Sequence, residues 1–207
     1  MDSRLATPDD IDLVATICAE GFFDDPVMSW TLRDPATRRD RLIHIFRGLA
    51  TEMLDEGRGV VHLVDDACAS LWRTPDFDHH GEARSVDHDD GDGAAAEQAA
   101  PAEHPFDAVD LARLGVLDEV MHDHHPRERH WYLNVICTRP AAQGRGLGAR
   151  ALADVLARCD AEGDRIYLES TNPRNRTLYR RSGFVDGPEI PIPDGPAMLA
   201  MWRDPQR

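Results

Sequence analysis

The pattern of apolar and polar residues divides the chain into short apolar runs and longer segments with helical spacing. The short runs are typical of strands and lie at residues 3–6, 60–64, 67–73, 131–137, 165–170 and 196–203. Helices are expected over residues 35–56, 107–122, 149–159 and 176–181, after a first helix that begins at Pro8 and breaks at residues 22–26. The chain therefore alternates strands with helices over most of its length.

Several boundaries of these elements carry local signals. Thr7 before Pro8 is a helix N-cap, and Gly57-Arg58-Gly59 ends a helix. Asp65-Asp66 suits a hairpin turn between two strands. Prolines interrupt residues 185–193, which we interpret as a link between two elements. The apolar side of the helix at residues 107–122 is formed by Leu111, Leu114, Leu117 and Met121.

Composition narrows the class of protein. A length of 207 residues fits one domain over residues 1–207, and 42% of the residues are hydrophobic. No apolar run approaches the ~18 to 20 residues that cross a membrane, and the N-terminal residues do not resemble a signal peptide. The four cysteines lie on apolar faces without a C-x-x-C pair, so we expect buried free thiols in a reducing compartment. These features predict a cytoplasmic globular protein.

The formal net charge of −15 narrows the kinds of binding partner that the protein can have. It argues against nucleic acid and anionic membranes, because phosphate binding needs clustered basic side chains. Residues 76–105 contain few large apolar side chains, and residues 76–110 hold about 10 of the 15 net negative charges, so we expect a mobile acidic insertion within the domain at residues 76–105. Histidines among its aspartates leave a metal site as an alternative, but their spacing repeats no ligand motif, and a solvated loop is favoured.

One glycine-rich stretch lies between the strand at 131–137 and the helix at 149–159. It reads Gln143-Gly144-Arg145-Gly146-Leu147-Gly148. The free N–H groups and the dipole of a helix N-terminus attract phosphate, while glycines allow close backbone approach and an arginine adds a charged fork. The stretch matches neither the Walker nor the Rossmann motif, and the chain contains no lysine. A phosphate cradle and a plain helix-capping loop both fit these residues.

Residues after this stretch favour the phosphate cradle over the helix-capping loop. Gln143-x-x-Gly146-x-Gly148, Asn175, Tyr179 and Gly183-Phe184, in this order and spacing, resemble the Gcn5-related N-acetyltransferase (GNAT) superfamily, most of all its puromycin N-acetyltransferase type. The resemblance implies the GNAT α/β fold, a mixed and mostly antiparallel sheet that splays between its fourth and fifth strands and is flanked by helices. It also implies acetyl-CoA as cosubstrate and no metal. The coenzyme is then expected at Ile136, Cys137, Thr138, Gln143, Gly144, Arg145, Gly146, Gly148, Asn175 and Tyr179.

The same resemblance implies chemical roles. A bulge and the splay are expected to free backbone N–H groups at residues 136–138, which stabilise the thioester oxygen as it gains charge. Tyr179 is expected to protonate the departing thiolate, with packing under the coenzyme as the alternative. Many relatives carry a glutamate on the central strand near the position of Asn134, which cannot accept a proton. Glu169, His130 and a water chain stay open as the general base.

The acceptor side is less well defined by the sequence. In the family, the segment after the first helix walls the acceptor, so Phe22, Phe23 and Trp30 are candidate substrate contacts, although core packing is favoured for aromatic residues at these spacings. Four histidines precede the central strand: His122, His124, His125 and His130. They fit the acceptor side or a solvated connector, and we favour the connector.

The sequence thus predicts an acetyl-CoA-dependent N-acetyltransferase that acts on a primary amine of a small molecule, as a monomer or a homodimer. Acetylation of a protein amine is the alternative within enzymes. A coenzyme-binding sensor without turnover, and a metal-binding interaction protein built on the acidic segment, are the alternatives outside them.

Overall fold

The computed structural model of the protein describes residues 2–76 and 105–206. Its strands are β1 (Ser3–Leu5), β2 (Val60–Val64), β3 (Cys68–Arg73), β4 (Trp131–Thr138), β5 (Ile166–Ser170), β6 (Val185–Ile190) and β7 (Met198–Arg203). Its helices are α1 (Ile11–Phe22), α2 (Pro26–Thr31), α3 (Pro35–Leu54), α4 (Ala108–His124), α5 (Leu147–Glu162) and α6 (Arg176–Arg181). Short 3₁₀ turns η1 (Pro8–Asp10), η2 (Pro140–Ala142) and η3 (Pro173–Asn175) precede α1, α5 and α6.

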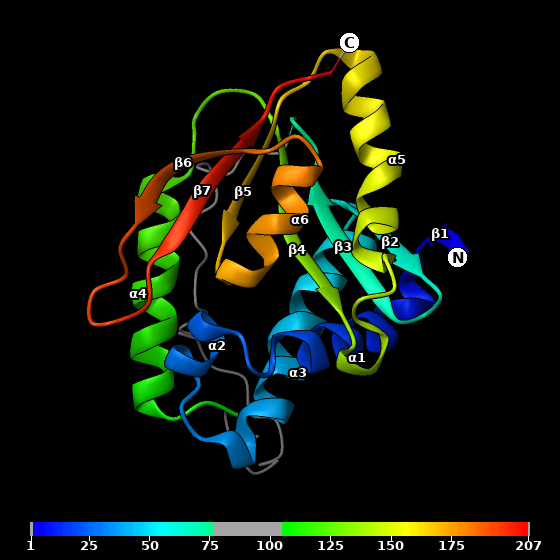
Figure 1. Ribbon diagram of the computed structural model, residues 1–207. Helices are drawn as coiled ribbons and strands as arrows, with labels where there is room; N and C mark the ends of the chain where they lie inside the picture. The colour runs from blue at the N-terminus through cyan, green and yellow to red at the C-terminus, as the bar shows by residue number, and fades with distance from the viewer. Residues whose placement is uncertain (1, 77–104, 207) are drawn as a thin grey trace, which may run out of the picture.

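The strands of the described residues form one sheet in the order β1-β2-β3-β4-β5-β7-β6 (Figure 1). Neighbours run antiparallel except β4 and β5, which are parallel. These two strands pair only at Trp131–Ile166 and Tyr132–Tyr167, near their N-terminal ends. Beyond these pairs the strands part. The predicted mixed, mostly antiparallel sheet with a splay between the fourth and fifth strands is confirmed.

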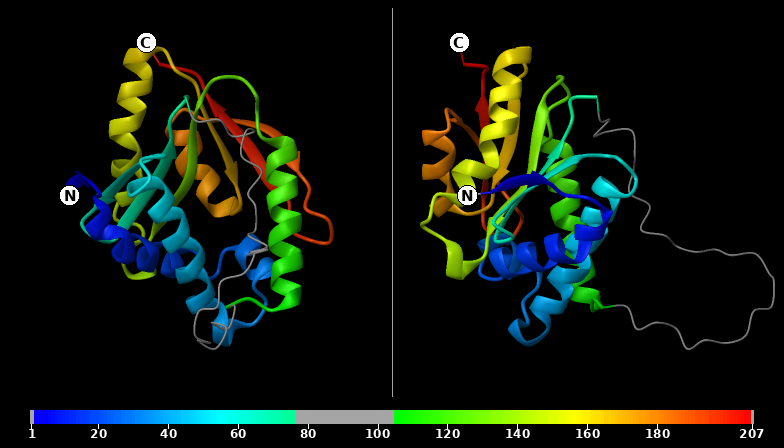
Figure 2. Two further views of the ribbon diagram at one scale, coloured as in Figure 1. Left: turned by 180° about the vertical axis from the view of Figure 1, so that it is seen from behind. Right: turned by 90° about the vertical axis from the view of Figure 1, so that its right-hand side faces the viewer.

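Helices cover both faces of this sheet. Helices α5 and α6 lie on one face, and α1, α3 and α4 lie on the other, as the side view in Figure 2 shows. The core under α5 and α6 includes Leu152 and Tyr179. A second core lies under α1 and α3, and a third contains Val27 of α2 and Leu117 of α4. The sheet therefore separates two sides of the molecule, and its strands part between β4 and β5.

A bulge in β4 changes which side chains face which helices. Leu71 pairs with Val135 and Trp72 pairs with Leu133, so Asn134 has no counterpart on β3. As a result, Leu133 and Ile136 both lie in the core under α5, although they are three residues apart. A β-bulge adds one residue to one strand, bends it and interrupts its ladder. The bulge thus lies in β4 beside the splay, as the family resemblance implied.

The predicted helices and strands are present, but one segment was assigned wrongly. Residues 185–193 were expected to be a link, whereas Val185–Ile190 is the strand β6. Proline lacks a ladder N–H, so strands with proline are confined to sheet edges or bulges. β6 meets both conditions, since it is the edge strand and its register with β7 shifts between Asp186 and Glu189.

Two further differences concern helices on the acceptor side. Helix α2, which Asp25 caps through its side chain, was not predicted. In α4, Leu117 is buried as expected, but Leu111 is 40% exposed. The helix instead buries the polar residue Asp110, which forms an ion pair with Arg41 of α3. A buried ion pair therefore takes the place of an apolar contact, and the apolar pattern alone does not reveal it.

The expectation of a mobile acidic insertion falls on residues 76–105, and all of these except Asp76 and Pro105 lie outside the described residues. No helix of the described residues is long and apolar enough to span a membrane. The four cysteines are buried and free, as predicted.

Candidate active site

The opening between β4 and β5 leaves part of the β4 backbone without a strand partner on one side. The Arg139 N–H donates to the Ala67 carbonyl at 2.9 Å, toward β3. Successive N–H groups of a strand point to opposite sides, so those of Ile136 and Thr138 point into the opening. The side chain of Cys137 points away from it, toward α1, where its Sγ lies 3.3 Å from Cys18 Sγ.

The glycine-rich turn lies at the end of β4 and begins α5. Gly146 is the N-cap of α5 in a left-handed conformation (φ +82°), and Gly144 also has positive φ (+76°). The side chains of Gln143 and Arg145 are exposed, and Gln143 Nε2 donates to the Thr138 carbonyl at 3.2 Å. The first N–H groups of α5 have no partner inside the helix. This geometry fits an anion-binding helix N-terminus and also a plain helix-capping loop, so the phosphate cradle stays a prediction.

Helix α6 lies beside this turn. A Cβ at Gly148 would stand 3.0 Å from Leu178 Cδ2, so the first turn of α5 approaches α6 closely. Asn175 stands at the N-terminus of α6, is exposed, and makes no capping hydrogen bond with its side chain. Tyr179 is buried against Phe184, with ring centroids 5.9 Å apart. Burial, together with the charge of Asp25, raises the pKa of Tyr179, so the phenol stays protonated at neutral pH.

Asp25 belongs to this region, although the sequence pattern marked it only as a helix breaker. Its Oδ1 accepts from the N–H groups of Val27 and Met28, and its Oδ2 accepts from Thr171 Oγ1 at 2.7 Å. Thr171 directly follows β5, so this carboxylate ties α2 to the open end of β5. The side chain is almost fully buried, and burial raises the pKa of Asp25 against the opposing effect of these hydrogen bonds. The Asp-Pro pair was the available signal, and it indicates a helix start but not burial.

Glu169 lies two residues past Tyr167, the last residue of β5 that pairs with β4. Its side chain is 2% exposed, whereas the residue as a whole is half-buried, so the exposed part is its backbone, beside the opening. Neither carboxylate oxygen accepts a hydrogen bond of normal geometry from the described residues. The His125 ring lies next to this carboxylate, with its Nδ1 3.4 Å from Glu169 Oε1.

His130 joins this cluster through His125. The Nε2 atoms of the two rings lie 3.1 Å apart, and His130 Nδ1 lies 2.6 Å from the Glu128 carbonyl oxygen. Both histidines are buried, at 3% and 9% exposure for His130 and His125. The favoured interpretation as a solvated connector is therefore wrong for these two and correct for His122 and His124, which are exposed.

The surroundings of this cluster are aromatic and dry. Tyr132 and Tyr167 are buried, and burial together with the Glu169 charge raises the pKa of each hydroxyl. Burial also lowers the pKa of His130, although the Glu128 carbonyl opposes this effect. A neutral imidazole and protonated phenols therefore surround one buried carboxylate.

The three aromatic candidates for substrate contact are packed residues. Phe22 packs against Phe46, with ring centroids 5.1 Å apart, and Phe23 lies under the Arg38 guanidinium. Trp30 has a different role, because it joins three elements. Its Nε1 donates to the Asp194 carbonyl at 2.7 Å, in the loop between β6 and β7, and Arg113 of α4 stacks on its ring at 4.8 Å.

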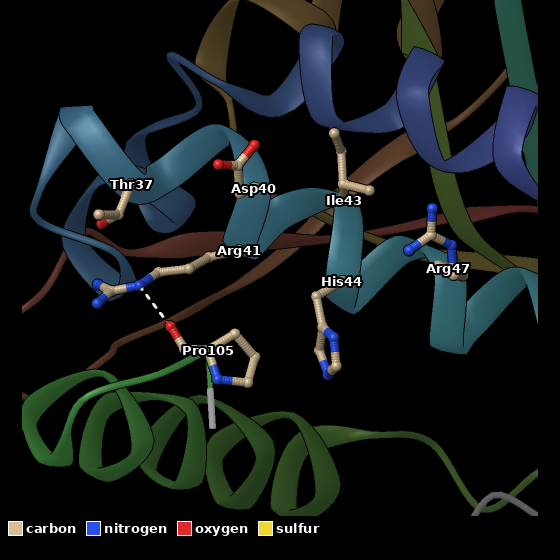
Figure 3. A pocket seen from close by; sticks show the side chains of 7 residues that line it. All are labelled: Thr37, Asp40, Arg41, Ile43, His44, Arg47 and Pro105. Carbon is tan, nitrogen blue, oxygen red and sulfur yellow. Dashed lines mark hydrogen bonds between the residues drawn. The ribbon is translucent and has the colours of Figure 1, made fainter. Parts of the chain in front are cut away.

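Other features of the described residues lie outside this site. An open groove of about 420 Å³ lies beside α3 and is lined by Thr37, Asp40, Arg41, Ile43, His44, Arg47 and Pro105 (Figure 3). None of these residues belongs to β4, β5, α5 or α6. Within residues 2–76 and 105–206, no group of three His, Cys, Asp or Glu side chains is arranged to hold a metal ion.

Comparisons with known proteins agree with this geometry. The model of the acetyltransferase (GNAT) family matches residues 66–184, which include the opening, the turn and α6. An uncharacterized N-acetyltransferase of Schizosaccharomyces pombe, C550.08, is 27% identical over 199 residues, covering 89% of this chain and 74% of the yeast protein.

Solved structures give the same result. The structure of histone acetyltransferase HPA2 and related acetyltransferase from Corynebacterium glutamicum is 26% identical, with a TM-score of 0.66, over 99% of this chain and 96% of its own. Agmatine N-acetyltransferase shares the fold at 14% identity, with a TM-score of 0.56 over 98% of each chain. Because the family model covers more than half of the chain, the protein belongs to the acetyltransferase (GNAT) family and is an acetyl-CoA-dependent N-acetyltransferase.

Proposed function

We propose that the protein transfers the acetyl group of acetyl-CoA to a primary amine of a small molecule, by direct attack of the amine on the thioester. The observation that carries this proposal is the parting of β4 and β5 beyond Tyr132 and Tyr167, beside the bulge at Asn134. This opening connects the face that carries the glycine-rich turn with the face that carries Glu169. Coenzyme and amine can meet there from opposite faces of the sheet.

The coenzyme is assigned to the α5 side. Its pyrophosphate would lie on the N–H groups and side chains of Gln143–Gly148, with Arg145 as the charged fork and Asn175 as a contact from α6. The pantetheine arm would lie in the opening. Backbone groups of Ile136, Cys137 and Thr138 line that path, and N–H groups directed into the opening would stabilise the thioester oxygen.

Tyr179 is assigned as the donor to the departing thiolate. Its raised pKa keeps the proton on the phenol, so Tyr179 acts first as a hydrogen-bond donor to the sulfur as charge develops there. Tyr179 is also part of the core. Packing and proton donation are therefore roles of the same side chain, and a Phe substitution separates them.

Glu169 is assigned as the group that receives the proton of the incoming ammonium. It is buried, beside the opening, and without a hydrogen bond of normal geometry from the described residues. A buried carboxylate in that state is costly unless a cation or donor approaches it. His130, the other candidate from the sequence, reaches Glu169 only through His125.

A small amine is favoured over a protein amine by the contacts of Trp30. They fasten α2, α4 and the β6–β7 loop together over the acceptor side, which supports a confined site and not an open groove for a polypeptide. The relative named as a histone acetyltransferase keeps the protein amine as the second candidate.

A thiol-release assay tests the function. The protein is incubated with acetyl-CoA and a panel of small primary amines. A lysine-containing peptide and a mixture of carboxylic acids that contain no amine are tested separately. We expect thiol release with at least one small amine and none with the acids. Release with the peptide alone would overturn the small-molecule assignment. Coenzyme-dependent thermal stabilisation without release in any arm would indicate a binding protein without turnover.

A further inference from the structure

The contacts among His125, His130 and Glu169 indicate where the protons of these side chains lie and how many protons the cluster can take up. Neither the glycine-rich motif nor the family comparison gives this information. It rests on the proposed function only where it concerns catalysis. Three contacts run in series: Glu128 O to His130 Nδ1 (2.6 Å), His130 Nε2 to His125 Nε2 (3.1 Å), and His125 Nδ1 to Glu169 Oε1 (3.4 Å). The side chains are buried, so a contact in this series that lacks a proton between its two polar atoms is costly.

The first two contacts constrain the positions of the protons. The Glu128 carbonyl only accepts, so His130 Nδ1 carries a proton. One proton must also lie between the two Nε2 atoms. When His130 is neutral, its Nε2 holds the lone pair and that proton belongs to His125 Nε2.

The third contact then lacks a proton. A neutral His125 with its proton on Nε2 presents the Nδ1 lone pair to the ionised Glu169 carboxylate, which is repulsive. One additional proton removes the repulsion. It can lie on Glu169, on His125 as an imidazolium, or on His130 as an imidazolium when His125 carries its single proton on Nδ1. Each of these placements satisfies all three contacts.

We propose that Glu169, His125 and His130 act as one base that takes up a single proton, and that His125 is the positioning residue that couples the other two. In the resting cluster without the extra proton, the repulsion between Glu169 and His125 favours an approaching ammonium. The ammonium then supplies the proton that completes the series.

The proton balance of a turnover is consistent with this role. The ammonium gives one proton to the cluster, and the free amine lone pair attacks the thioester carbon. As the C–S bond breaks, the second N–H proton replaces the proton that Tyr179 gives to the thiolate. The cluster therefore carries one proton per acetyl group transferred and releases it before the next turnover, from His130 beside the exposed residue Glu128.

Neighbouring groups do not titrate in competition with the cluster. Tyr132 of β4 and Tyr167 of β5 face Glu169, and their raised pKa values keep both uncharged. Arg73 of β3 is held by Glu52 at 2.8 Å and carries a permanent charge. Glu128 faces His130 from the connector and is exposed. Burial lowers the pKa of His130 and so disfavours an imidazolium on that ring.

A double-mutant cycle on the full chain tests the coupling. The variants are His125→Gln, Glu169→Gln and the double variant, with His124→Gln as the control, because His124 directly precedes His125 at the end of α4 and is exposed. At saturating acetyl-CoA, we expect His125→Gln to lower kcat by about 10²-fold and to move the acid limb of its pH profile, without changing KM for acetyl-CoA. We expect the double variant to be no slower than Glu169→Gln, because the residues act as one unit.

A second readout is independent of activity. Imidazole ¹⁵N NMR of the protein without substrates should give His130 protonated on Nδ1 and the two rings titrating together. Multiplicative losses in the double variant, or a neutral His130 protonated on Nε2, would overturn the coupled base. If no amine gives thiol release with the wild type, the proposed function fails, and the tautomers still decide the coupling.

Discussion

At the scale of single residues, the site depends on buried polar groups more than on its recognisable motif. Asp25, His125 and Glu169 have buried side chains. The sequence marked Asp25 as part of a helix break, favoured a solvated connector for His125 and left Glu169 as one of several candidate bases. Only contacts that the fold creates bring these residues to the site. Tyr179 is the exception, since its spacing from Gly183-Phe184 placed it correctly on α6. Motif residues were therefore predictable, whereas their partners across the opening were not, because those contacts join residues more than 40 positions apart or depend on burial.

The role of Tyr179 is tested by Tyr179→Phe. The substitution keeps the ring that packs on Phe184 and removes only the hydroxyl. We expect kcat to fall by about 10²-fold, because the thiolate loses its donor, while the Kd of acetyl-CoA from calorimetry is unchanged. A variant with wild-type turnover would remove the donor role and leave Tyr179 as a packing residue.

Asp25 allows capping and charge to be separated. Asp25→Ala removes the cap of α2 and should cost about 1 kcal/mol of stability. Asp25→Asn keeps an effective cap but removes the buried charge. Because the folded-state pKa is raised, the charge of Asp25 opposes folding above the unfolded pKa of about 3.9, and this penalty is absent below it.

The sign of the pH effect follows. The stability of Asp25→Asn relative to the wild type should increase as pH rises from about 4 toward 7, because the wild type acquires the penalty over that range. Urea melts at the two ends of the range measure the difference. The interpretation is wrong if Asp25→Asn is destabilised as much as Asp25→Ala at neutral pH.

At the scale of elements, the two ends of α5 show how a glycine can serve binding or only geometry. Gly146 begins the helix with φ +82°, and Gly163 ends it with φ +77°. Left-handed backbone costs other residues about 1–2 kcal/mol, so both positions favour glycine. Only Gly146 belongs to the turn assigned to the pyrophosphate.

A matched pair of variants separates these effects. Gly146→Ala and Gly163→Ala impose similar strain on opposite ends of one helix, and a Cβ at Gly163 meets no atom within 4 Å. We expect similar losses of thermal stability, but a higher Kd for acetyl-CoA only in Gly146→Ala, measured by calorimetry. Equal affinity in the two variants would show that the turn does not hold the coenzyme.

Helices and strands were predicted reliably from the sequence where the apolar periodicity was strong. Prediction failed where the position of a segment in the assembled sheet determines its structure. Strands β2 to β5 and helices α3 and α5 have clear apolar patterns and were predicted to within a few residues. β6 was missed because Pro188 is tolerated only at an edge, and edges are a property of the assembled sheet. The bulge at Asn134 shifts the faces of β4, which no single-strand pattern reveals.

At the scale of the whole molecule, the two faces of the sheet carry different parts of the proposed site. The face with α5 and α6 carries the turn for the coenzyme, and the face with α1, α2, α3 and α4 carries the groups for the amine. The opening between β4 and β5 connects them. The net charge of −15 agrees with an amine as the second substrate, while the coenzyme is held by local N–H groups and Arg145.

The most direct measurement of this account is backbone hydrogen exchange with and without acetyl-CoA. We predict slower exchange of the N–H groups of Ile136, Thr138 and residues 143–149, since the coenzyme would bind to them, with little change in α3. Unchanged exchange in both segments at saturating acetyl-CoA, or protection confined to another part of the chain, would contradict the central claim that the opening and the glycine-rich turn hold the coenzyme.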